Sequence, residues 1–266
     1  MKKLTLLAII CSLLLCGCTV KDPQSTKPQS TPLSSENTPD SSNPVEEEKN
    51  EKLLLKGKEY LICNSDSTVG SVEIFLFEGK SAAAIKNLQT EIIFRFFPKQ
   101  GYDNITLKNS KTDVDKTKDY SELGFDLDCR IALMSEDIIS IVYSGNLTMK
   151  GSAHPSDLFL TLNFDPETCK LISVSDIYHT DGRMYDIIMN NADPFLKKAW
   201  GDSWKEIDLE WALCAKENFE SALEGGSDIN AYFTEDGIGF CFSVPSVLGN
   251  HVEIELKEEL IEHLKK

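Results

Sequence analysis

The sequence predicts an α+β fold, mainly antiparallel sheet with helices packed on one side of it. Apolar residues alternate strictly along 125–133, which is typical of a half-buried strand, and residues 138–149 follow a Glu-Asp turn as the antiparallel partner. An Asp-Gly pair between the apolar runs at 231–233 and 238–244 indicates a second hairpin. The chain beyond residue 52 has room for one moderate domain or two small, closely packed ones.

Two strands and a helix are expected before the first hairpin. Apolar runs at 59–64 and 71–77 have the length and composition of strands. Four apolar residues recur at helical spacing within 81–97, and Pro98 follows the last of them, which predicts a helix there. Residues 92–97 would also suit a strand.

The second half of the chain alternates turn residues with apolar segments. Asp165 and Pro166 supply turn chemistry, and Pro194 interrupts a helical pattern. The remaining predicted elements are strands over 158–164, 170–174 and 252–256, and helices over 183–200, 207–223 and 257–265.

The first 18 residues have the order of a bacterial lipoprotein signal. Two lysines precede an apolar run over 4–15, which is too short to span a bilayer, and a Leu-Cys-Gly tripeptide precedes Cys18. We expect residues 1–17 to be removed and Cys18 to become the lipidated first residue. An ordinary signal peptide with an incidental cysteine is the alternative.

A tether is expected between this anchor and the folded part. Residues 19–50 contain almost no large apolar side chains and hold five of the ten prolines, so they cannot bury enough surface to offset the entropy of ordering. Residues 18–52 are therefore predicted to hold the folded part off the outer face of the bacterial cell membrane. That part is divided into 53–137 and 138–266.

The charge of the chain narrows the classes of partner. Removal of residues 1–17 takes away two of the 27 basic residues and none of the 43 acidic ones, which moves the net charge from −16 to −18. Such a charge repels nucleic acid and anionic lipid headgroups, and it attracts cationic partners. Solubility alone is an equally good reason for it.

Short motifs follow one another in a characteristic order between residues 138 and 256. They are a tyrosine, Ser-Gly, small residues with His-Pro, then Asn163-Phe164-Asp165, Thr168, Leu171, Ser175-Asp176-Ile177-Tyr178, Thr234-Glu235-Asp236-Gly237 and a terminal Val-Glu-Ile-Glu-Leu strand. This order resembles a bacterial extracellular family of domains of unknown function. The family is similar to the lysozyme-sensing ectodomain of certain anti-sigma factors and to the non-catalytic module of a peptidoglycan deacetylase. The resemblance implies a binding or sensor-like module rather than an enzyme.

Two positions depart from the family pattern. Cys169 stands where the family's Asp-x-x-Thr-Gly turn has glycine, so a left-handed backbone there must be accommodated or changed. Residues 245–249 replace a segment that contains proline and tyrosine in the family, which alters a loop that can face a partner.

Two loops form the expected partner-binding surface, because loops on a sheet scaffold commonly carry recognition. The candidate residues are Gly151, Ser152, His154, Pro155 and Asp157 in the first loop, and Pro245, Val247, Leu248 and Asn250 in the second. The expected partner is a cationic envelope-directed protein, with a lysozyme-type protein as the first candidate. No cofactor, metal or nucleic acid is expected, and the membrane is contacted through the lipid anchor.

A peptidoglycan-processing enzyme and a structural lipoprotein are the alternatives. The densest titratable set is His154, Asp157, Asp165, Asp176, His179 and Asp181. These types could perform acid–base chemistry, but a structural turn at His154, a turn at Asp165 and a helix cap at Asp176 explain them more simply. The sequence has no His-Glu-x-x-His, no Gly-x-Ser-x-Gly and no phosphate-binding glycine loop.

Cysteines and tryptophans add no motif. The cysteines of the folded part are Cys63, Cys129, Cys169, Cys214 and Cys241. We expect mostly reduced thiols, although export permits disulfides. Trp200, Trp204 and Trp211 could form a sugar-stacking platform, but their spacing favours core packing and a loop between two helices.

Overall fold

The computed structural model describes residues 52–64, 68–96, 105–108, 123–225 and 228–266. All the elements below belong to one compact unit of the chain, which ends at Lys266. The expected signal, Cys18 and the tether up to residue 51 lie outside the described residues. Within the described part, no helix is long and apolar enough to cross a membrane.

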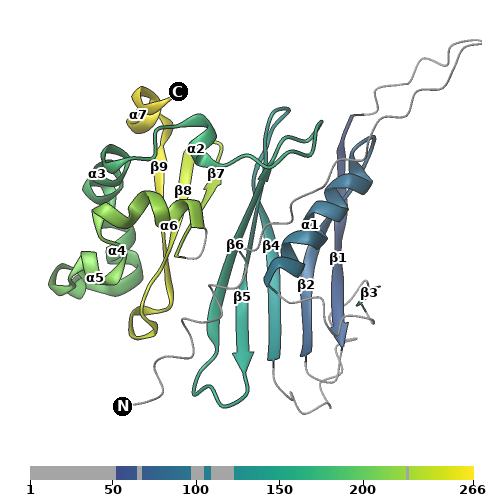
Figure 1. Ribbon diagram of the computed structural model, residues 1–266, viewed down its shortest axis with the longest axis horizontal. Helices are drawn as coiled ribbons and strands as arrows, with labels where there is room; N and C mark the ends of the chain where they lie inside the picture. Colours follow the sequence, from purple (N-terminus) through teal and green to yellow (C-terminus); the bar gives the residue numbers. More distant parts are fainter. Residues whose placement is uncertain (1–51, 65–67, 97–104, 109–122, 226–227) are drawn as a thin grey trace, which may run out of the picture. The chain divides into compact units, whose positions relative to one another are not determined.

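A six-stranded sheet in the order β3-β1-β2-β4-β5-β6 holds the first half of the fold (Figure 1). Its strands are β1 (Leu54–Asn64), β2 (Thr68–Glu78), β3 (Ile105–Lys108), β4 (Leu123–Met134), β5 (Ile139–Met149) and β6 (Ser156–Phe164). Neighbouring strands are antiparallel except β2 and β4, which run parallel. The predicted strands at 59–64 and 71–77 and the hairpin at 125–149 are confirmed. The β4–β5 ladder joins residues on both sides of position 137.

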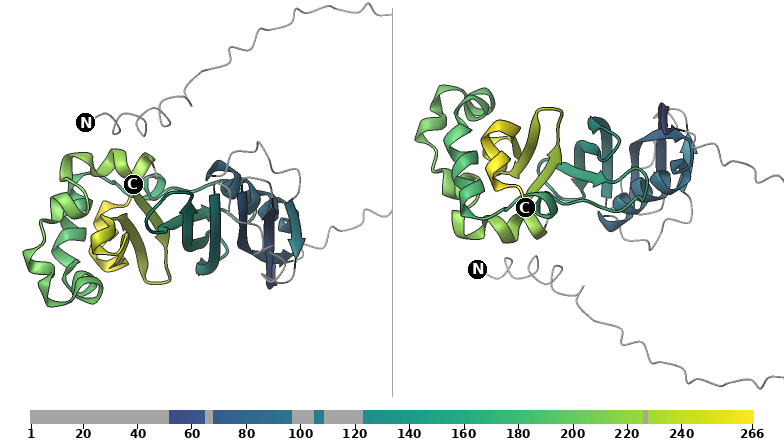
Figure 2. Two further views of the ribbon diagram at one scale, coloured as in Figure 1. Left: turned by 90° about the horizontal axis from the view of Figure 1, so that it is seen from below. Right: turned by 90° about the horizontal axis from the view of Figure 1, so that it is seen from above.

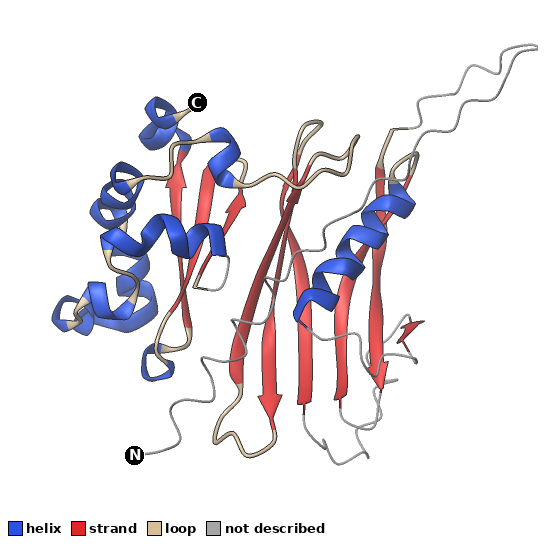
Figure 3. Ribbon diagram, viewed as in Figure 1, coloured by secondary structure: helices blue, strands red, loops and turns tan. Residues whose placement is uncertain are grey.

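Helix α1 (Ala82–Phe96) packs on one face of this sheet (Figure 3). Ile85 of α1 is fully buried among apolar side chains of β2, β4, β5 and β6, which include Ile74, Leu127, Ile141 and Leu162. The helix predicted over 81–97 is therefore confirmed, and the strand considered for 92–97 is wrong. Ile85 and Gln89, four residues apart on one helix face, are both buried, as expected for an amphipathic helix packed on a sheet.

A three-stranded antiparallel sheet in the order β7-β8-β9 holds the second half. Its strands are β7 (Ile229–Phe233), β8 (Gly237–Ser243) and β9 (His251–Lys257). The helices are α2 (Val174–Ile177), α3 (Gly182–Asn191), α4 (Asp193–Trp200), α5 (Leu209–Ala212), α6 (Phe219–Gly225) and α7 (Glu258–Ile261). Helices α3, α4, α6 and α7 gather beside one face of this sheet (Figure 2), where Phe240 and Ile254 are fully buried. The α+β class, mainly antiparallel, is confirmed.

Two predicted elements are wrong. Residues 170–174 form only an isolated bridge, Phe164 to Leu171, because the Ser173 backbone N–H donates to Asp176 (2.7 Å) and this cap begins α2. The helix predicted over 207–223 is broken into α5, a 3₁₀ turn (Lys216–Asn218) and α6, because Ala215 is extended. The interruption expected at Pro194 is confirmed, since α3 ends at Asn191 and Pro194 lies in the first turn of α4.

Buried polar side chains join the two sheets. Ser140 donates to Asn163 (2.6 Å), and Asn163 donates through its side-chain amide to the Ala231 carbonyl of β7 (2.9 Å). The Phe233 backbone N–H of β7 donates in turn to the Ser140 hydroxyl (3.1 Å). The outer edge of β7 is thus hydrogen-bonded to side chains of β5 and β6. This Ser140–Asn163 relay takes the place of a continuous ladder between the sheets.

Candidate functional site

The first candidate loop lies between β5 and β6. Gly151 has φ of +82°, a left-handed conformation that glycine adopts without a steric cost. The Ser152 backbone N–H donates to the Met149 carbonyl (3.0 Å), and the Ser152 hydroxyl donates to the His154 carbonyl (2.8 Å). Pro155 immediately precedes β6. Asp157 is the second residue of that strand and pairs with Asn146 of β5. All five candidate residues of this loop are exposed.

The second candidate loop connects β8 to β9 around a 3₁₀ turn (Ser246–Leu248) that Pro245 precedes. Val247 is 82% exposed at the tip of this turn, whereas Leu248 is half-buried and its carbonyl accepts a hydrogen bond from Trp200 Nε1 (2.7 Å). Asn250 has φ of +69°, and its carbonyl accepts from the Val244 backbone N–H (2.9 Å). The loop is therefore held at its base and open at Val247.

The structure brings these two loops together. Asp157 Oδ2 lies 3.1 Å from Nδ1 of His251, the first residue of β9, and each side chain is about one-third exposed. The His251 ring also packs against Phe159 of β6, with 5.6 Å between ring centroids. The segments at 151–157 and 244–251 therefore meet through Asp157 and His251, and we term the two segments together the loop surface.

A cleft adjoins the loop surface. It has a cavity of about 580 Å³ lined in part by Arg130 of β4, Phe195 of α4, and His251 and Glu255 of β9. A second cavity of about 400 Å³ shares Arg130, Phe195 and Glu255 with the first and continues to Lys257. The two cavities therefore adjoin each other along β9, and we term them together the β9 cleft.

A hydrogen-bonded cluster fixes one wall of the β9 cleft. Arg130 Nη2 lies 2.6 Å from Glu253 Oε2, and its guanidinium lies 4.8 Å from the centre of the Tyr232 ring. The Tyr232 hydroxyl donates to Glu253 (2.6 Å) or Glu255 (3.0 Å). Burial and the neighbouring Glu253 raise the pKa of Tyr232 well above its ordinary range, so this phenol remains a neutral donor.

The residues of this cluster carry no signal in the sequence that would mark them as a site. Arg130 lies among the polar positions of the alternating 125–133 pattern, and Glu253 and Glu255 lie among those of the terminal strand. Alternation predicts a polar face for each strand, but it does not indicate that the two polar faces meet each other.

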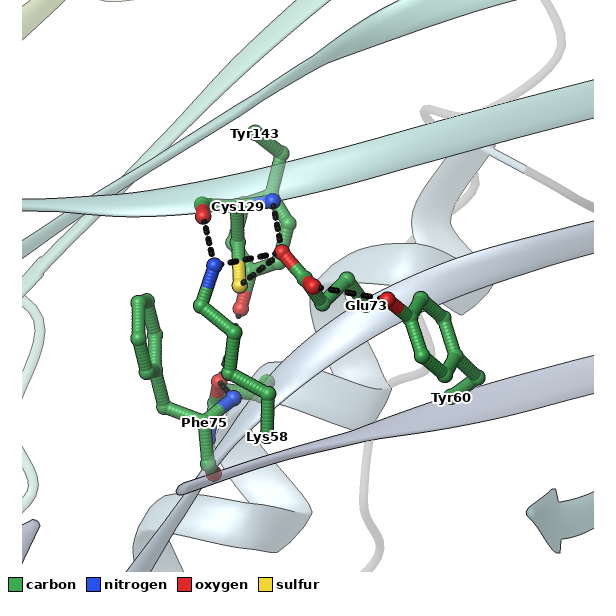
Figure 4. Close-up of polar contacts among 7 residues, drawn as sticks. Lys58, Tyr60, Glu73, Phe75, Cys129 and Tyr143 are labelled. Carbon is green, nitrogen blue, oxygen red and sulfur yellow. Dashed lines mark hydrogen bonds and ion pairs between the residues drawn. The ribbon is translucent and has the colours of Figure 1, made fainter. Parts of the chain in front are cut away.

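A second polar cluster lies within the six-stranded sheet (Figure 4). Glu73 of β2 is its centre: Oε2 accepts from Lys58 Nζ (2.6 Å) and from the Cys129 backbone N–H (3.1 Å), and Oε1 accepts from the Tyr60 hydroxyl (2.9 Å). Burial opposes ionisation of Glu73, but these hydrogen bonds outweigh it and lower the pKa of the carboxyl below its ordinary value of 4.5. Burial, followed by the charge of Glu73, raises the pKa of the Cys129 thiol far above its ordinary value, which makes this thiol a poor nucleophile.

This cluster replaces missing backbone pairing. The parallel β2–β4 ladder ends at Val72 and Leu127. Beyond it, Glu73 accepts from Cys129, Lys58 Nζ donates to the Cys129 carbonyl (2.7 Å), and the buried Gln89 side chain of α1 bonds both backbone groups of Phe75 (2.9 Å each). Both carboxylate oxygens of Glu73 are occupied, so we assign this cluster to the architecture of the sheet rather than to catalysis.

Three of the residues considered for an enzymatic site, Asp165, Asp176 and Asp181, serve separate turns and helix ends. Asp165 accepts from the backbone N–H groups of Glu167 (2.8 Å) and Thr168 (3.0 Å), and Asp176 caps α2. Asp181 caps α3 and binds Arg183, whose hydrogen bonds lower the pKa of the Asp181 carboxyl to about 2. In the described ranges, no three His, Cys, Asp or Glu side chains are grouped so as to hold a metal ion.

The cysteines and tryptophans take mainly packing roles. Among the cysteines whose side chains are described, Cys129 and Cys241 are buried free thiols, and Cys169 and Cys214 are half-buried free thiols. The side chain of Cys63 lies outside the description. Trp200 and Trp204 pack against the core of the second half as expected, but Trp211 is 60% exposed on α5, so core packing was the wrong prediction for that residue.

Comparison with known proteins places structural neighbours in a bacterial family of domains of unknown function. No family model and no curated protein matches the chain. A DUF3298 family protein from Pseudomonas aeruginosa PAO1 covers 81% of this chain and 94% of its own at 13% identity, with a TM-score of 0.48. A DUF3298 family protein from Bacteroides fragilis covers 81% of this chain and 93% of its own at 13% identity, with a TM-score of 0.43.

Proposed function

We propose that the chain is a lipid-anchored extracellular binding or sensor-like module of the bacterial envelope, and that its partner is a cationic protein. The observation that carries this proposal is the contact between Asp157 and His251, which joins two separate loops into the single loop surface. Surfaces formed by loops on a sheet scaffold commonly bind partners.

Charge and attachment support the proposal. The net charge of −16, or −18 once residues 1–17 are removed, would accelerate encounter with a basic protein. Acylation of Cys18 by two chains, at about 0.8 kcal/mol per buried methylene, would anchor the module stably at the outer face of the cell membrane. A tether up to residue 52 would then present the loop surface away from the lipid.

A lysozyme-type protein is the first candidate partner. It follows from the resemblance of residues 138–256 to the lysozyme-sensing ectodomain of certain anti-sigma factors, and such muramidases are basic. The same family is similar to the non-catalytic module of a peptidoglycan deacetylase, and we therefore propose binding rather than wall cleavage as the activity.

Titration of the full chain in detergent with a lysozyme tests this function. We expect saturable one-to-one binding that weakens with salt and also weakens about tenfold in Val247→Ser, because exposed apolar side chains at an interface centre contribute strongly. Leu171→Ser is the matched control, since Leu171 is an exposed apolar residue outside the loop surface and the substitution leaves the charge unchanged.

Two outcomes would contradict the proposal. Equal binding by Val247→Ser, Leu171→Ser and the unchanged chain, with loss only on addition of salt, would reduce the association to nonspecific attraction. Absence of binding at low salt would exclude lysozyme-type proteins as partners.

A further inference from the structure

Strand β9 is an edge strand whose outer side faces a cleft. In the sheet order β7-β8-β9 it pairs with β8 alone. The opposite edge, on β7, is occupied by the Ser140–Asn163 relay. Among the residues that the structure describes, no hydrogen bond joins the outer side of β9 to another backbone segment. The His251 amide on this side donates locally to the Gly249 carbonyl (2.9 Å), and from Glu253 onward every second backbone amide and carbonyl of β9 is available to a further strand.

The β9 cleft opens along this edge. Phe195 belongs to α4, which packs with Val252 on the helix-covered face of the sheet. Arg130 belongs to β4 and lies with Tyr232 and Glu253 on the opposite face. Both cavities are lined by Phe195 and Arg130 together with residues of β9. A cleft bounded from both faces of the strand must pass around its outer edge.

The two sides of β9 differ in chemistry. Val252, Ile254 and Leu256 are buried on the helix side, whereas Glu253 and Glu255 lie on the side of Arg130. Glu253 is neutralised by Arg130, but Glu255 is exposed and its Oε1 accepts only from the neutral Tyr232 hydroxyl among the described contacts. An added strand would therefore meet a carboxylate on one face and an apolar surface, with Phe195, on the other.

We propose that the outer edge of β9 binds an extended peptide segment of the partner by strand addition. Basic side chains of that segment lie beside Glu255, and the alternate apolar side chains lie beside Phe195. Lys198 also lines the cleft on the α4 side, and this exposed amine disfavours basic side chains on that face. The inference rests on the proposed function for the cationic character of the partner, and it adds the shape and the side-chain pattern of the bound segment.

A second copy of the chain is a poor occupant of this edge. Antiparallel pairing of two β9 strands would place the exposed Glu255 side chains of the two copies on the same face, and like charges on adjacent strands repel. The net charge of −16 on each copy adds to this repulsion. Charged residues on an edge strand prevent self-association while leaving the edge open to a strand of opposite charge.

The test uses a seven-residue peptide of alternating lysine and valine with the full chain in detergent. Two further versions are N-methylated on alternate amides, one in each frame. Strand addition uses every second amide, so methylation in one frame should weaken binding at least tenfold and methylation in the other should change it little. Charge is identical in all three peptides.

Protein variants complete the test. Glu255→Gln should weaken peptide binding about fivefold, whereas Glu259→Gln, an exposed glutamate on α7 with the same change of charge, should have no effect. Amide hydrogen exchange should slow in β9 on peptide binding and remain unchanged in β7. Equal loss in both methylation frames, or equal effects of the two substitutions, would overturn the proposal, as would absence of peptide binding.

The peptide experiment and the lysozyme titration test different claims, and either can fail without the other. Frame-dependent peptide binding without lysozyme binding would support the edge site and reject that partner. Lysozyme binding that depends on Val247 but leaves β9 exchange unchanged would support the proposed function and reject the edge site.

Discussion

Cys169 occupies a backbone conformation that most side chains avoid. Its φ is +55°, in a turn where its backbone N–H donates to the Asp165 carbonyl (2.8 Å) and Asp165 accepts from two further amides. The left-handed geometry expected from the family pattern is therefore retained although glycine is absent. A side chain costs roughly 1–2 kcal/mol in this region.

Cys169→Gly should therefore raise the free energy of unfolding by about 0.5 kcal/mol, since relief of strain exceeds the added chain entropy and the lost packing. Cys169→Val should lower it by about 1–2 kcal/mol, because a β-branched residue tolerates positive φ least. Urea unfolding at constant pH measures both. A valine variant more stable than the glycine variant would contradict the account.

Glu73 should contribute a pH-dependent part of the stability. Its pKa is lower in the folded chain than its ordinary value of 4.5, so ionised Glu73 stabilises the fold above about pH 4.5, and the contribution is lost as pH falls through the folded-state pKa. Glu73→Gln should lower the free energy of unfolding by about 1–3 kcal/mol near neutral pH and flatten the acid slope.

Urea unfolding of the unchanged protein and of the Glu73→Gln variant, at about pH 6 and about pH 3, measures this effect. Glu91→Gln, at an exposed glutamate of α1, is the control and should retain the acid slope of the unchanged chain. If Glu73→Gln keeps the full slope, the carboxyl does not have the role assigned to it.

At the scale of elements, local chemistry explains what the sequence could predict. Turn and cap residues such as Asp165 and Asp176 act within a few positions of themselves, so their roles were predictable. The strand predicted over 170–174 did not form because the Asp176 cap competes with β propensity.

The cluster around Arg130 was unpredictable because Arg130 and Glu253 are 123 residues apart in sequence. The contact between Asp157 and His251 was not foreseen for the same reason, although both loops were selected.

Asn163 connects the elements of the two sheets. Its amide oxygen accepts from Ser140 and its nitrogen donates to Ala231, both in buried surroundings. Asn163→Ala should lower the free energy of unfolding by about 2–4 kcal/mol, because it leaves two buried groups without partners. Asn146→Ala, at an exposed position of β5, should change it by less than about 0.5 kcal/mol. Urea unfolding compares the two, and equal effects would refute the relay as a stabilising contact.

At the scale of the whole molecule, attachment to the membrane is the main prediction. Cys18→Ala should block lipidation and move the protein from the membrane fraction to the soluble or secreted fraction, because a short apolar run alone does not anchor it stably. Cys16→Ala is the matched control and should remain membrane-bound. Fractionation followed by mass spectrometry of the first residue measures both. Full retention and normal processing of Cys18→Ala would refute the lipoprotein assignment.

The short parallel β2–β4 ladder joins two antiparallel parts of the larger sheet, β3-β1-β2 and β4-β5-β6. Backbone pairing between them is confined to five residue pairs, from Thr68–Leu123 to Val72–Leu127, whereas β4, β5 and β6 follow one another as antiparallel neighbours. Sub-global opening should begin where few bonds join distant segments, so amides of β1 and β2 should exchange at a lower opening free energy than those of β5. A mechanical force transmitted along the chain from residue 52 would act first on β1. It would therefore load the β2–β4 ladder before it loads the loop surface.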